Sequence, residues 1–378
     1  MVETAPATAR AGKDAGDARY VFLDYLRACA AWLVVWDHLG AIMPGWSGKV
    51  FAPAEWLRAH VTRPLGIIQD FGWFGVALFF LISGFIISDR ARVESARDFV
   101  IRRVLRIYPM LAVAVLLSAA LAADKAQVTP VNIVTNLTLA NYLITPQVVL
   151  LGVAWTLVIE VMFYALTAAT QVLRDSPHRI GLNLVVAALV IWKRGVLGGH
   201  LVWFGVYAMY LPVLVMGQTV YWWLSRRRLS TALGLGYLAA AFGVFLSGVS
   251  LVEPAYLPLT NSYAISVAYA LALFAGLVKL RLPQVRAVRF LSDTSYSLYL
   301  LHGIAGPLVL KALIPRAPLG LAIAAAAATS LAAAASSYWM VERPLQRIAR
   351  RLTRPGGDAS DPSADAVRPD SEVQAPAA

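Results

Sequence analysis

The sequence has little charge and almost no cysteine. Charged residues make up 14% and hydrophobic residues 59% of the 378 residues, whereas soluble domains average about 25% and about 45–50%. This balance excludes a soluble enzyme and a disordered protein. The single cysteine, Cys29, cannot form an internal disulfide, so a disulfide scaffold is excluded as well. We expect Cys29 to be a small packing residue in the first apolar segment.

Sequence signatures of several enzyme classes are also missing. The histidines are scattered without metal-ligand spacing, so no metal site is expected. Neither a P-loop nor a dinucleotide-binding glycine fingerprint is present, and a Gly-x-Ser-x-Gly nucleophile elbow is absent. The net charge of +12 does not indicate nucleic acid, because the basic residues lie beside apolar segments, as in membrane proteins.

Long apolar segments follow one another through most of the chain. Several exceed the roughly 18–20 residues that a helix needs to cross a ~30 Å hydrocarbon core. The pattern predicts an all-α fold, a polytopic membrane helix bundle of about ten transmembrane helices. The expected spans are residues 22–43, 71–88, 104–123, 148–170, 180–193, 201–224, 231–251, 261–278, 293–311 and 318–341.

The basic residues predict the orientation of these spans. The densest basic stretch runs from Arg90 to Arg106, whereas the segments around residues 45–70 and 252–262 are poor in positive charge. Placing the basic segments in the cytoplasm puts both termini there, provided that residues 131–144 do not cross the membrane. Further basic groups lie at residues 226–228, 279–289 and 343–354.

The two ends of the chain differ from the apolar region between them. Residues 1–19 and 353–378 are rich in Ala, Asp and other small or polar residues, so both are expected to be disordered tails. Residues 20–352 are expected to form one membrane domain. No cleavable signal peptide is evident, because the first apolar segment is interrupted by Arg27 and is longer than a signal core.

Ionisable side chains inside a span are functional candidates, because charge is costly to bury in a membrane. Arg27 and His38 are eleven residues apart in the first span, so an α-helix directs them within ~20° of each other and ~16 Å apart along its axis. Asp24 lies within about 60° of the same line. This face should point into the bundle. The alternative is an Asp24–Arg27 anchor at the interface, with His38 as a satisfied polar contact.

Four further candidate residues lie within later spans or at the point where a cytoplasmic loop meets one. Arg103 and Arg106 share a helix face and could clamp phosphates, although such clusters also fix topology or contact anionic lipid. Glu160 is isolated in a long apolar stretch, so it should pair with an arginine or a histidine, or be neutral. For His302, a structural role is the simpler interpretation.

Five ordered motifs together resemble the integral-membrane acyltransferase-3 family, whose members acylate sugars of polysaccharides, lipopolysaccharide and some antibiotics. The resemblance covers about Leu23 to Pro344. The form Ala154-Trp155-Thr156-Leu157 is most similar to the branch that O-acetylates bacterial exopolysaccharides. The motifs are Arg27-(ten residues)-His38; the segment from Gly75 to Phe85; Arg103 and Arg106 followed by Pro109; Trp155-Thr156-Leu157 leading to Glu160, Phe163 and Tyr164; and the segment from Ser295 to His302 with Glu342-Arg343-Pro344.

The resemblance implies a reaction and a division of roles. Acetyl-coenzyme A, a substrate and not a permanently bound cofactor, would deliver the acyl group from the cytoplasm to a carbohydrate beyond a bacterial inner membrane. His38 would act as general base or accept the acyl group covalently, and Glu160 would orient or charge-stabilise the imidazole or an arginine. The expected donor-binding residues are Arg27, Arg103 and Arg106, and the expected surrounding residues are Asp24, Trp155, Tyr164, Tyr296 and His302.

Two positions depart from the family pattern. Ala77 stands where the family often has a polar or acidic residue, and Asp37 stands where an apolar or aromatic residue is usual. Asp37 should point ~100° away from His38 and contact another helix.

A transporter or flippase for a glycan or lipid-linked sugar remains the main alternative function, and an acyltransferase for an antibiotic-like small molecule is another. Whether the protein forms a homo-oligomer or joins a polysaccharide-assembly complex stays open.

Overall fold

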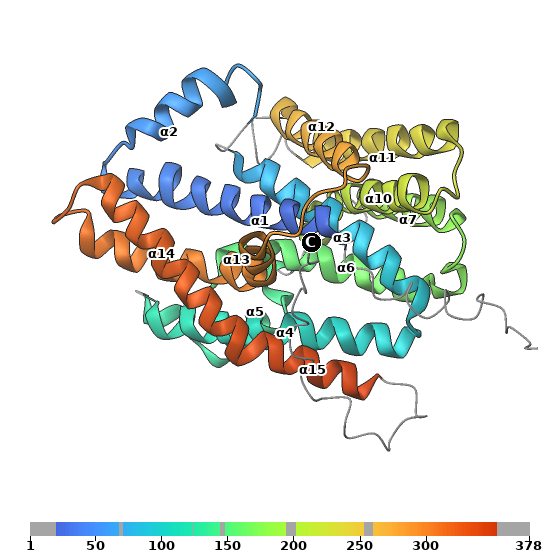
Figure 1. Ribbon diagram of the computed structural model, residues 1–378. Helices are drawn as coiled ribbons and strands as arrows, with labels where there is room; N and C mark the ends of the chain where they lie inside the picture. Colours follow the sequence, from blue (N-terminus) through green and yellow to red (C-terminus); the bar gives the residue numbers. More distant parts are fainter. Residues whose placement is uncertain are drawn as a thin grey trace, which may run out of the picture.

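A computed structural model describes residues 20–67, 71–122, 124–143, 148–193, 202–252 and 260–353. Every regular element within these ranges is a helix (Figure 1), so the predicted all-α fold is confirmed. Helices satisfy the backbone polar groups within one segment, which a hydrocarbon environment requires. The predicted tails lie outside the described residues, except for Thr353.

The apolar helices make this chain a multi-pass membrane protein. Within the described ranges, eight helical stretches are long and apolar enough to cross a membrane, and two shorter apolar helices, His178–Trp192 and Tyr263–Leu277, lie at the other two of the ten predicted spans. The eight are Val21–Ser47, Gly72–Val93, Ala96–Leu121, Gly152–Ala169, Trp203–Ser225, Thr231–Leu251, Arg286–Leu313 and Leu319–Leu352.

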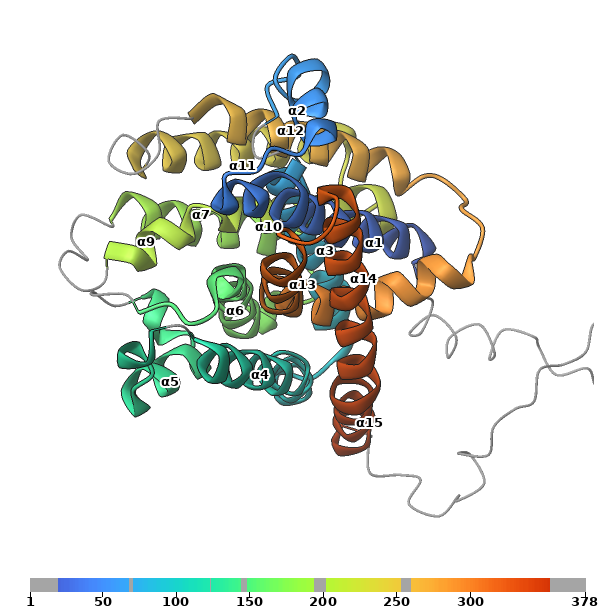
Figure 2. The same ribbon diagram turned by 90° about the vertical axis from the view of Figure 1, so that its left-hand side faces the viewer.

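The centre of the bundle is α3 (Gly72–Val93), which is apolar around most of its circumference. A helix of that kind is stable when other helices cover it on all sides. It packs against α1 (Val21–Val35), α10 (Leu211–Val220) and α12 (Thr260–Leu277). On the other side of α1 lies α13 (Arg286–Leu313), which in turn pairs with α14 (Leu319–Ser337) (Figure 2).

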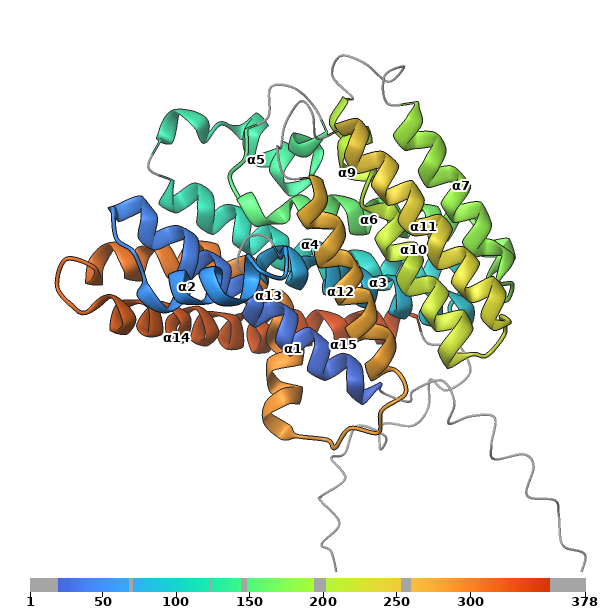
Figure 3. The same ribbon diagram turned by 90° about the horizontal axis from the view of Figure 1, so that it is seen from above.

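Two more helices complete the side of the bundle that carries the basic residues. The first, α4 (Ala96–Leu121), contacts α6 (Trp155–Ala169) and α13. The second, α15 (Arg343–Leu352), follows α14 in one helical stretch of 34 residues and packs on α4 (Figure 3). Such a stretch is about 51 Å long and exceeds a ~30 Å hydrocarbon core. The arginine-rich α15 therefore extends beyond the hydrocarbon.

Two sequence expectations concern short segments. The helix α5 (Pro130–Leu137) has only 8 residues, about 12 Å, so it cannot cross a bilayer, in agreement with the non-spanning prediction for residues 131–144. Cys29 differs from its prediction: it is exposed on the outside of the bundle. The α1 face opposite the charged residues is turned away from the core, which explains this position.

The contact between α3 and α10 depends on two glycines. A Cβ atom at Gly84 would collide with the backbone carbonyl of Leu214, and one at Gly217 would collide with that of Leu81. Backbone atoms cannot move aside as a flexible side chain can. Small residues at such crossings allow close helix packing in membranes, so these glycines set the distance between α3 and α10.

We expect Gly84→Ala to destabilise the protein by about 3 kcal/mol, because the added methyl group forces the two backbones apart. The matched control is Gly243→Ala, since a Cβ at Gly243 meets no atom within 4 Å. Thermal unfolding of both variants in detergent measures the difference. Equal midpoints for Gly84→Ala and Gly243→Ala would contradict the close crossing.

Candidate functional site

His38 lies on a local widening of the first membrane helix. The α-helical hydrogen bonding of α1 ends at Val35, and residues Trp36–Ile42 form a π-helical segment, η3. Short π-helical segments occur frequently at functional sites, because the extra residue per turn redirects the side chains that follow. The His38 side chain retains 28% exposure, whereas that of Asp37 retains 3%. The imidazole is thus open to a cavity, although it lies within the bundle.

His38 forms a pair with His302 on α13. The His38 Nδ1 and His302 Nε2 atoms are 2.6 Å apart, and the rings are parallel with centroids separated by 4.9 Å. His302 Nδ1 lies 3.0 Å from the carbonyl oxygen of Leu298. A carbonyl only accepts, so His302 Nδ1 carries its proton and His302 Nε2 is the acceptor for His38. His38 must then be protonated on Nδ1, which leaves the lone pair on Nε2.

Asp37 lies next to the reactive edge of this imidazole. Its Oδ2 atom is 3.9 Å from His38 Nε2. The carboxylate also packs against the start of α3, where a Cβ at Gly72 would overlap it. The expected contact with another helix is therefore present. The Asp37 carboxylate also lies close to the His38 ring. The ~100° turn per residue of an α-helix would direct the two side chains apart, but η3 is a π-helical segment.

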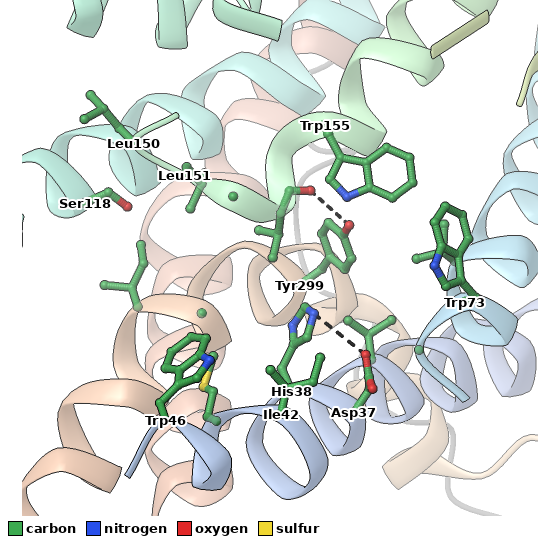
Figure 4. A pocket seen from close by; sticks show the side chains of 18 of the residues that line it. Asp37, His38, Ile42, Trp46, Trp73, Ser118, Leu150, Leu151, Trp155 and Tyr299 are labelled. Carbon is green, nitrogen blue, oxygen red and sulfur yellow. Dashed lines mark hydrogen bonds and ion pairs between the residues drawn. The ribbon is translucent and has the colours of Figure 1, made fainter. Parts of the chain in front are cut away.

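His38 and Asp37 line a cavity of about 550 Å³, which we call the histidine chamber. Figure 4 shows His38 and Asp37 on one wall, with Trp73, Trp155 and Tyr299 on the others. Trp73 contacts Trp155, and its ring stacks on Tyr210 at 5.2 Å. A cavity with aromatic walls and a few polar groups is typical of a ligand site. Trp155, one of the residues expected around the site, lines this cavity.

A narrow space of about 70 Å³, the waist, adjoins the histidine chamber. Tyr299 and Val76 line both cavities. The Tyr299 hydroxyl donates to the Val153 carbonyl (3.0 Å) and accepts from the Thr156 hydroxyl (3.0 Å). These bonds hold the phenol between the two spaces. Sequence analysis missed Tyr299, although its position three residues before His302 places both on one helix face.

Two larger cavities lie beyond the waist. The arginine chamber, about 320 Å³, shares Arg27, Arg106 and Tyr296 with the waist. The side chamber, about 430 Å³, shares four arginines with the arginine chamber. These four are Arg27, Arg90, Arg103 and Arg106. The three residues predicted to bind a donor thus lie together, and Arg90 joins them.

The arginines are partly balanced by carboxylates. Glu94 lies 3.0 Å from Arg102 and 3.7 Å from Arg103. The Arg103 guanidinium also lies over the rings of Phe99 and Tyr164, 5.1 and 5.7 Å from their centroids. Such pairing reduces the cost of burying a cation among membrane helices.

Glu160 faces the waist and not the histidine chamber. Its carboxylate accepts hydrogen bonds from Tyr164 and, at 3.3 Å, from Ser83. Its charge acts on Arg106, as does that of Glu342, and Glu342 accepts a hydrogen bond from Ser297. Of the two partners expected for Glu160, the arginine is the one that the structure places near it.

The remaining predicted residues lie at the edges of the cavities. Asp24 accepts a hydrogen bond from Ser292 (2.8 Å) and lines the side chamber. Tyr296 lines the waist, and its hydroxyl donates a hydrogen bond to the Ile107 carbonyl (2.9 Å). The part of the chain that the structure describes holds no group of three or more His, Cys, Asp or Glu side chains suited to a metal.

Comparison with known proteins gives a matching family and two similar proteins. The family described as "Acyltransferase domain" (acyltransferase-3) matches residues 20–339. The "Exopolysaccharide production protein ExoZ" of Rhizobium meliloti (strain 1021) is 32% identical over 326 residues, which cover 78% of this chain and 96% of that protein. "Nodulation protein 10" of Rhizobium leguminosarum bv. viciae is 29% identical over 382 residues, covering 87% and 95%. No solved structure matches the chain.

The two imidazoles should differ in chemical reactivity. His302 is fully buried, whereas His38 is open to the histidine chamber. Diethyl pyrocarbonate should therefore modify His38 in the folded protein and leave His302 unmodified until the protein is denatured. Peptide mass spectrometry over a time course measures both, with the exposed His60 as an internal reference. Equal modification of His38 and His302 would refute the assigned geometry.

Proposed function

Because this chain belongs to the membrane acyltransferase-3 family, we propose that it is an O-acetyltransferase that moves an acetyl group from cytoplasmic acetyl-coenzyme A to a sugar hydroxyl outside the cytoplasm. Family membership rests on residues 20–339 and on the relative that is 32% identical. That relative is a protein of exopolysaccharide production, which makes an exopolysaccharide the favoured acceptor. Acetyl-coenzyme A is consumed as a substrate, and no bound cofactor is required.

The observation that carries the proposal is the position of His38. Its Nε2 lone pair faces the histidine chamber, and this chamber adjoins the waist and then the arginine chamber. Phosphates bind well to clustered arginines through charge-assisted hydrogen bonds. The donor could therefore place its phosphates among Arg27, Arg103 and Arg106 while its pantetheine arm passes the waist toward His38.

The proposed reaction is a direct transfer. His38 Nε2 accepts the proton of the sugar hydroxyl while that oxygen attacks the thioester carbonyl. A new carbon–oxygen bond forms, the carbon–sulfur bond breaks, and the thiolate of coenzyme A takes the proton from the imidazolium. General-base catalysis of this kind contributes about 10²–10⁴-fold to a rate. The covalent alternative, in which Nε2 first accepts the acetyl group, uses the same lone pair.

Neighbouring groups would support the charge that develops on His38. The imidazolium keeps its hydrogen bond to His302 Nε2, and the Asp37 carboxylate at 3.9 Å from Nε2 attracts the positive charge. His302 would act through its acceptor nitrogen, because that nitrogen fixes which atom of His38 is basic. Glu160 would act on the donor side, by holding Arg106 in position rather than by touching the imidazole.

The membrane topology belongs to the same proposal. The short helices His178–Trp192 and Tyr263–Leu277 would complete ten crossings of the bacterial inner membrane. With ten crossings both termini lie in the cytoplasm, which agrees with the arginines of α15 and of the α3–α4 connection. The histidine chamber then opens toward the other side, where the carbohydrate acceptor is available.

The other functions that the sequence left open make different demands. Family membership favours an acyltransferase over a transporter or flippase. An acyltransferase for an antibiotic-like small molecule would use the same residues and differ only in its acceptor, so product analysis separates the two. Mass spectrometry of surface and secreted glycans from cells with and without the protein identifies the acceptor. Absence of any acetylated glycan would favour the small-molecule acceptor.

We expect His38→Ala to reduce acetyl transfer by about 10²–10⁴-fold, because no other base replaces Nε2. The acetyl content of the cell's polysaccharide, normalised to the amount of protein in the membrane, measures the loss. His60→Ala is the control, since His60 is an exposed histidine whose hydrogen bond is to the carbonyl of Trp56, one helical turn away. Full activity of His38→Ala at a normal protein level would refute the mechanism.

We expect Arg106→Ala to weaken coenzyme A binding by about 10–100-fold, because a charge-assisted contact to phosphate is lost. The wild-type affinity should fall as salt increases, and this dependence should be smaller in the variant. Isothermal titration of the purified protein in detergent measures both. Arg106→Lys keeps the charge near Glu160 and Glu342, so it distinguishes loss of binding from loss of folding. The matched control is Arg316→Ala, because Arg316 lies just after α13 and donates a hydrogen bond to the carbonyl of Ala312. Unchanged coenzyme A affinity of Arg106→Ala would refute the donor site.

A further inference from the structure

The last helix, α15, forms part of the wall of the arginine chamber. Gln346, Ala349 and Arg350 of α15 line this chamber together with the arginines of α1 and α4. Ala349 is buried against the bundle, and the helix is held in place by the hydrogen bond from Arg102 Nε to the Thr353 hydroxyl (2.8 Å). One face of α15 is thus packed and directed at the chamber, although its sequence is strongly basic.

Arg350 differs from Arg102 and Arg103 of this chamber in having no bonding partner. Arg102 is paired with Glu94 and bonded to Thr353, and Arg103 is paired with Glu94. Within the described ranges, the Arg350 guanidinium makes neither an ion pair nor a hydrogen bond, and its side chain is exposed at the chamber. A guanidinium has five N–H donors, so Arg350 has its full capacity available for a ligand.

The charge of the arginine chamber favours an anion. Six arginines and three carboxylic acids line it, so cations are in excess even when every acid is ionised. Several cations with a low-dielectric wall behind them concentrate negative ligands. A bound anion with more than one phosphate group would balance this excess.

The order of the cavities assigns a part of the donor to Arg350. Arg27, Arg106 and Tyr296 line both the waist and the arginine chamber, whereas Gln346 and Arg350 line the arginine chamber alone. If the thioester of a donor enters the waist, the other end of the donor lies in the arginine chamber, at the residues farthest from the waist. In coenzyme A that opposite end is the adenosine with its 3′-phosphate.

We propose that Arg350 of α15 binds the 3′-phosphate of the acyl donor and so selects coenzyme A over thioesters that lack this phosphate. This inference rests on the proposed function, because it presumes that the thioester passes the waist. Gln346, one turn earlier on the same face, is placed to donate a hydrogen bond to the same group. Arg350 is then a binding residue that the sequence analysis did not identify.

An anionic lipid head group is another phosphate that a basic helix at a membrane surface attracts. The two ligands can be separated because α15 carries a second exposed arginine with the same charge. Arg347 is exposed and lies outside the lining of the arginine chamber. Lipid attraction depends on both arginines, whereas the proposed 3′-phosphate contact depends on Arg350 alone.

The test compares coenzyme A with 3′-dephospho-coenzyme A on full-length protein in nanodiscs of neutral lipid. Wild-type protein should bind coenzyme A about tenfold more tightly, as expected for one charge-assisted contact. Arg350→Ala should weaken coenzyme A binding by about the same factor and leave the affinity for the dephospho form unchanged. Arg347→Ala should bind both ligands as the wild type does. Thermal unfolding of each variant without ligand verifies that the fold is intact.

Each other outcome contradicts the inference in a distinguishable way. If Arg350→Ala weakens both ligands equally, Arg350 does not contact the 3′-phosphate. If Arg350→Ala and Arg347→Ala have the same effect, and that effect appears only when phosphatidylglycerol is added to the nanodiscs, α15 binds lipid. If the folded wild-type protein binds neither ligand, the proposed donor is wrong, and the role of Arg350 fails with it.

Discussion

The structure depends on the requirement that ionisable side chains inside a membrane bundle be satisfied by other protein groups. An unpaired polar group costs several kcal/mol in hydrocarbon, so the helices that carry such groups must turn them toward each other. The pairs that result join helices far apart in sequence: Asp24 with Ser292, His38 with His302, Ser83 with Glu160, and Ser297 with Glu342. The cavities lie along this polar seam, since His38, Glu160 and Asp24 each line one of them.

Burial of a charge does not by itself create a site. Arg179 on α7 (His178–Trp192) is more deeply buried than Arg103, yet none of the four cavities described above includes it. Its guanidinium donates to the Thr170 hydroxyl (2.8 Å) and to the Thr167 carbonyl. It thereby caps the end of α6, where the helix dipole favours a cation. The arginines of the seam differ because open space adjoins them, and that difference separates a structural charge from a candidate binding residue.

The sequence was most informative where a physical cost is unavoidable. Asp24, Arg27 and His38 lie in an apolar span, so their inward direction followed from the cost of charge in lipid. The same argument gave Glu160 a choice of partners without deciding between them, because no local pattern shows which later helix lies opposite. The lengths of the helices were harder to predict: two of the ten predicted spans form shorter apolar helices, because composition alone does not fix where a helix ends.

The details that control the chemistry were out of reach of the sequence for a related reason. The place of Asp37 beside His38 follows from the π-helical segment η3, and the tautomer of His38 follows from the Leu298 carbonyl behind His302. Both depend on backbone positions that only the folded chain sets. Tyr299 could have been found by its spacing from His302, but its importance follows from its hydrogen bonds to Val153 and Thr156.

The sizes of the cavities explain how one bundle could serve two compartments without becoming a channel. The histidine chamber is about 550 Å³ and the arginine chamber about 320 Å³, whereas the waist between them is about 70 Å³. A space that small accommodates a thin chain but not a hydrated sugar or a nucleotide. Its wall combines the apolar side chains of Val76, Phe79 and Phe80 with charged groups, among them Arg106 and Glu160. A thioester arm is the kind of ligand that such a passage admits, because only one end of it has to reach His38 while its charged end stays among the arginines.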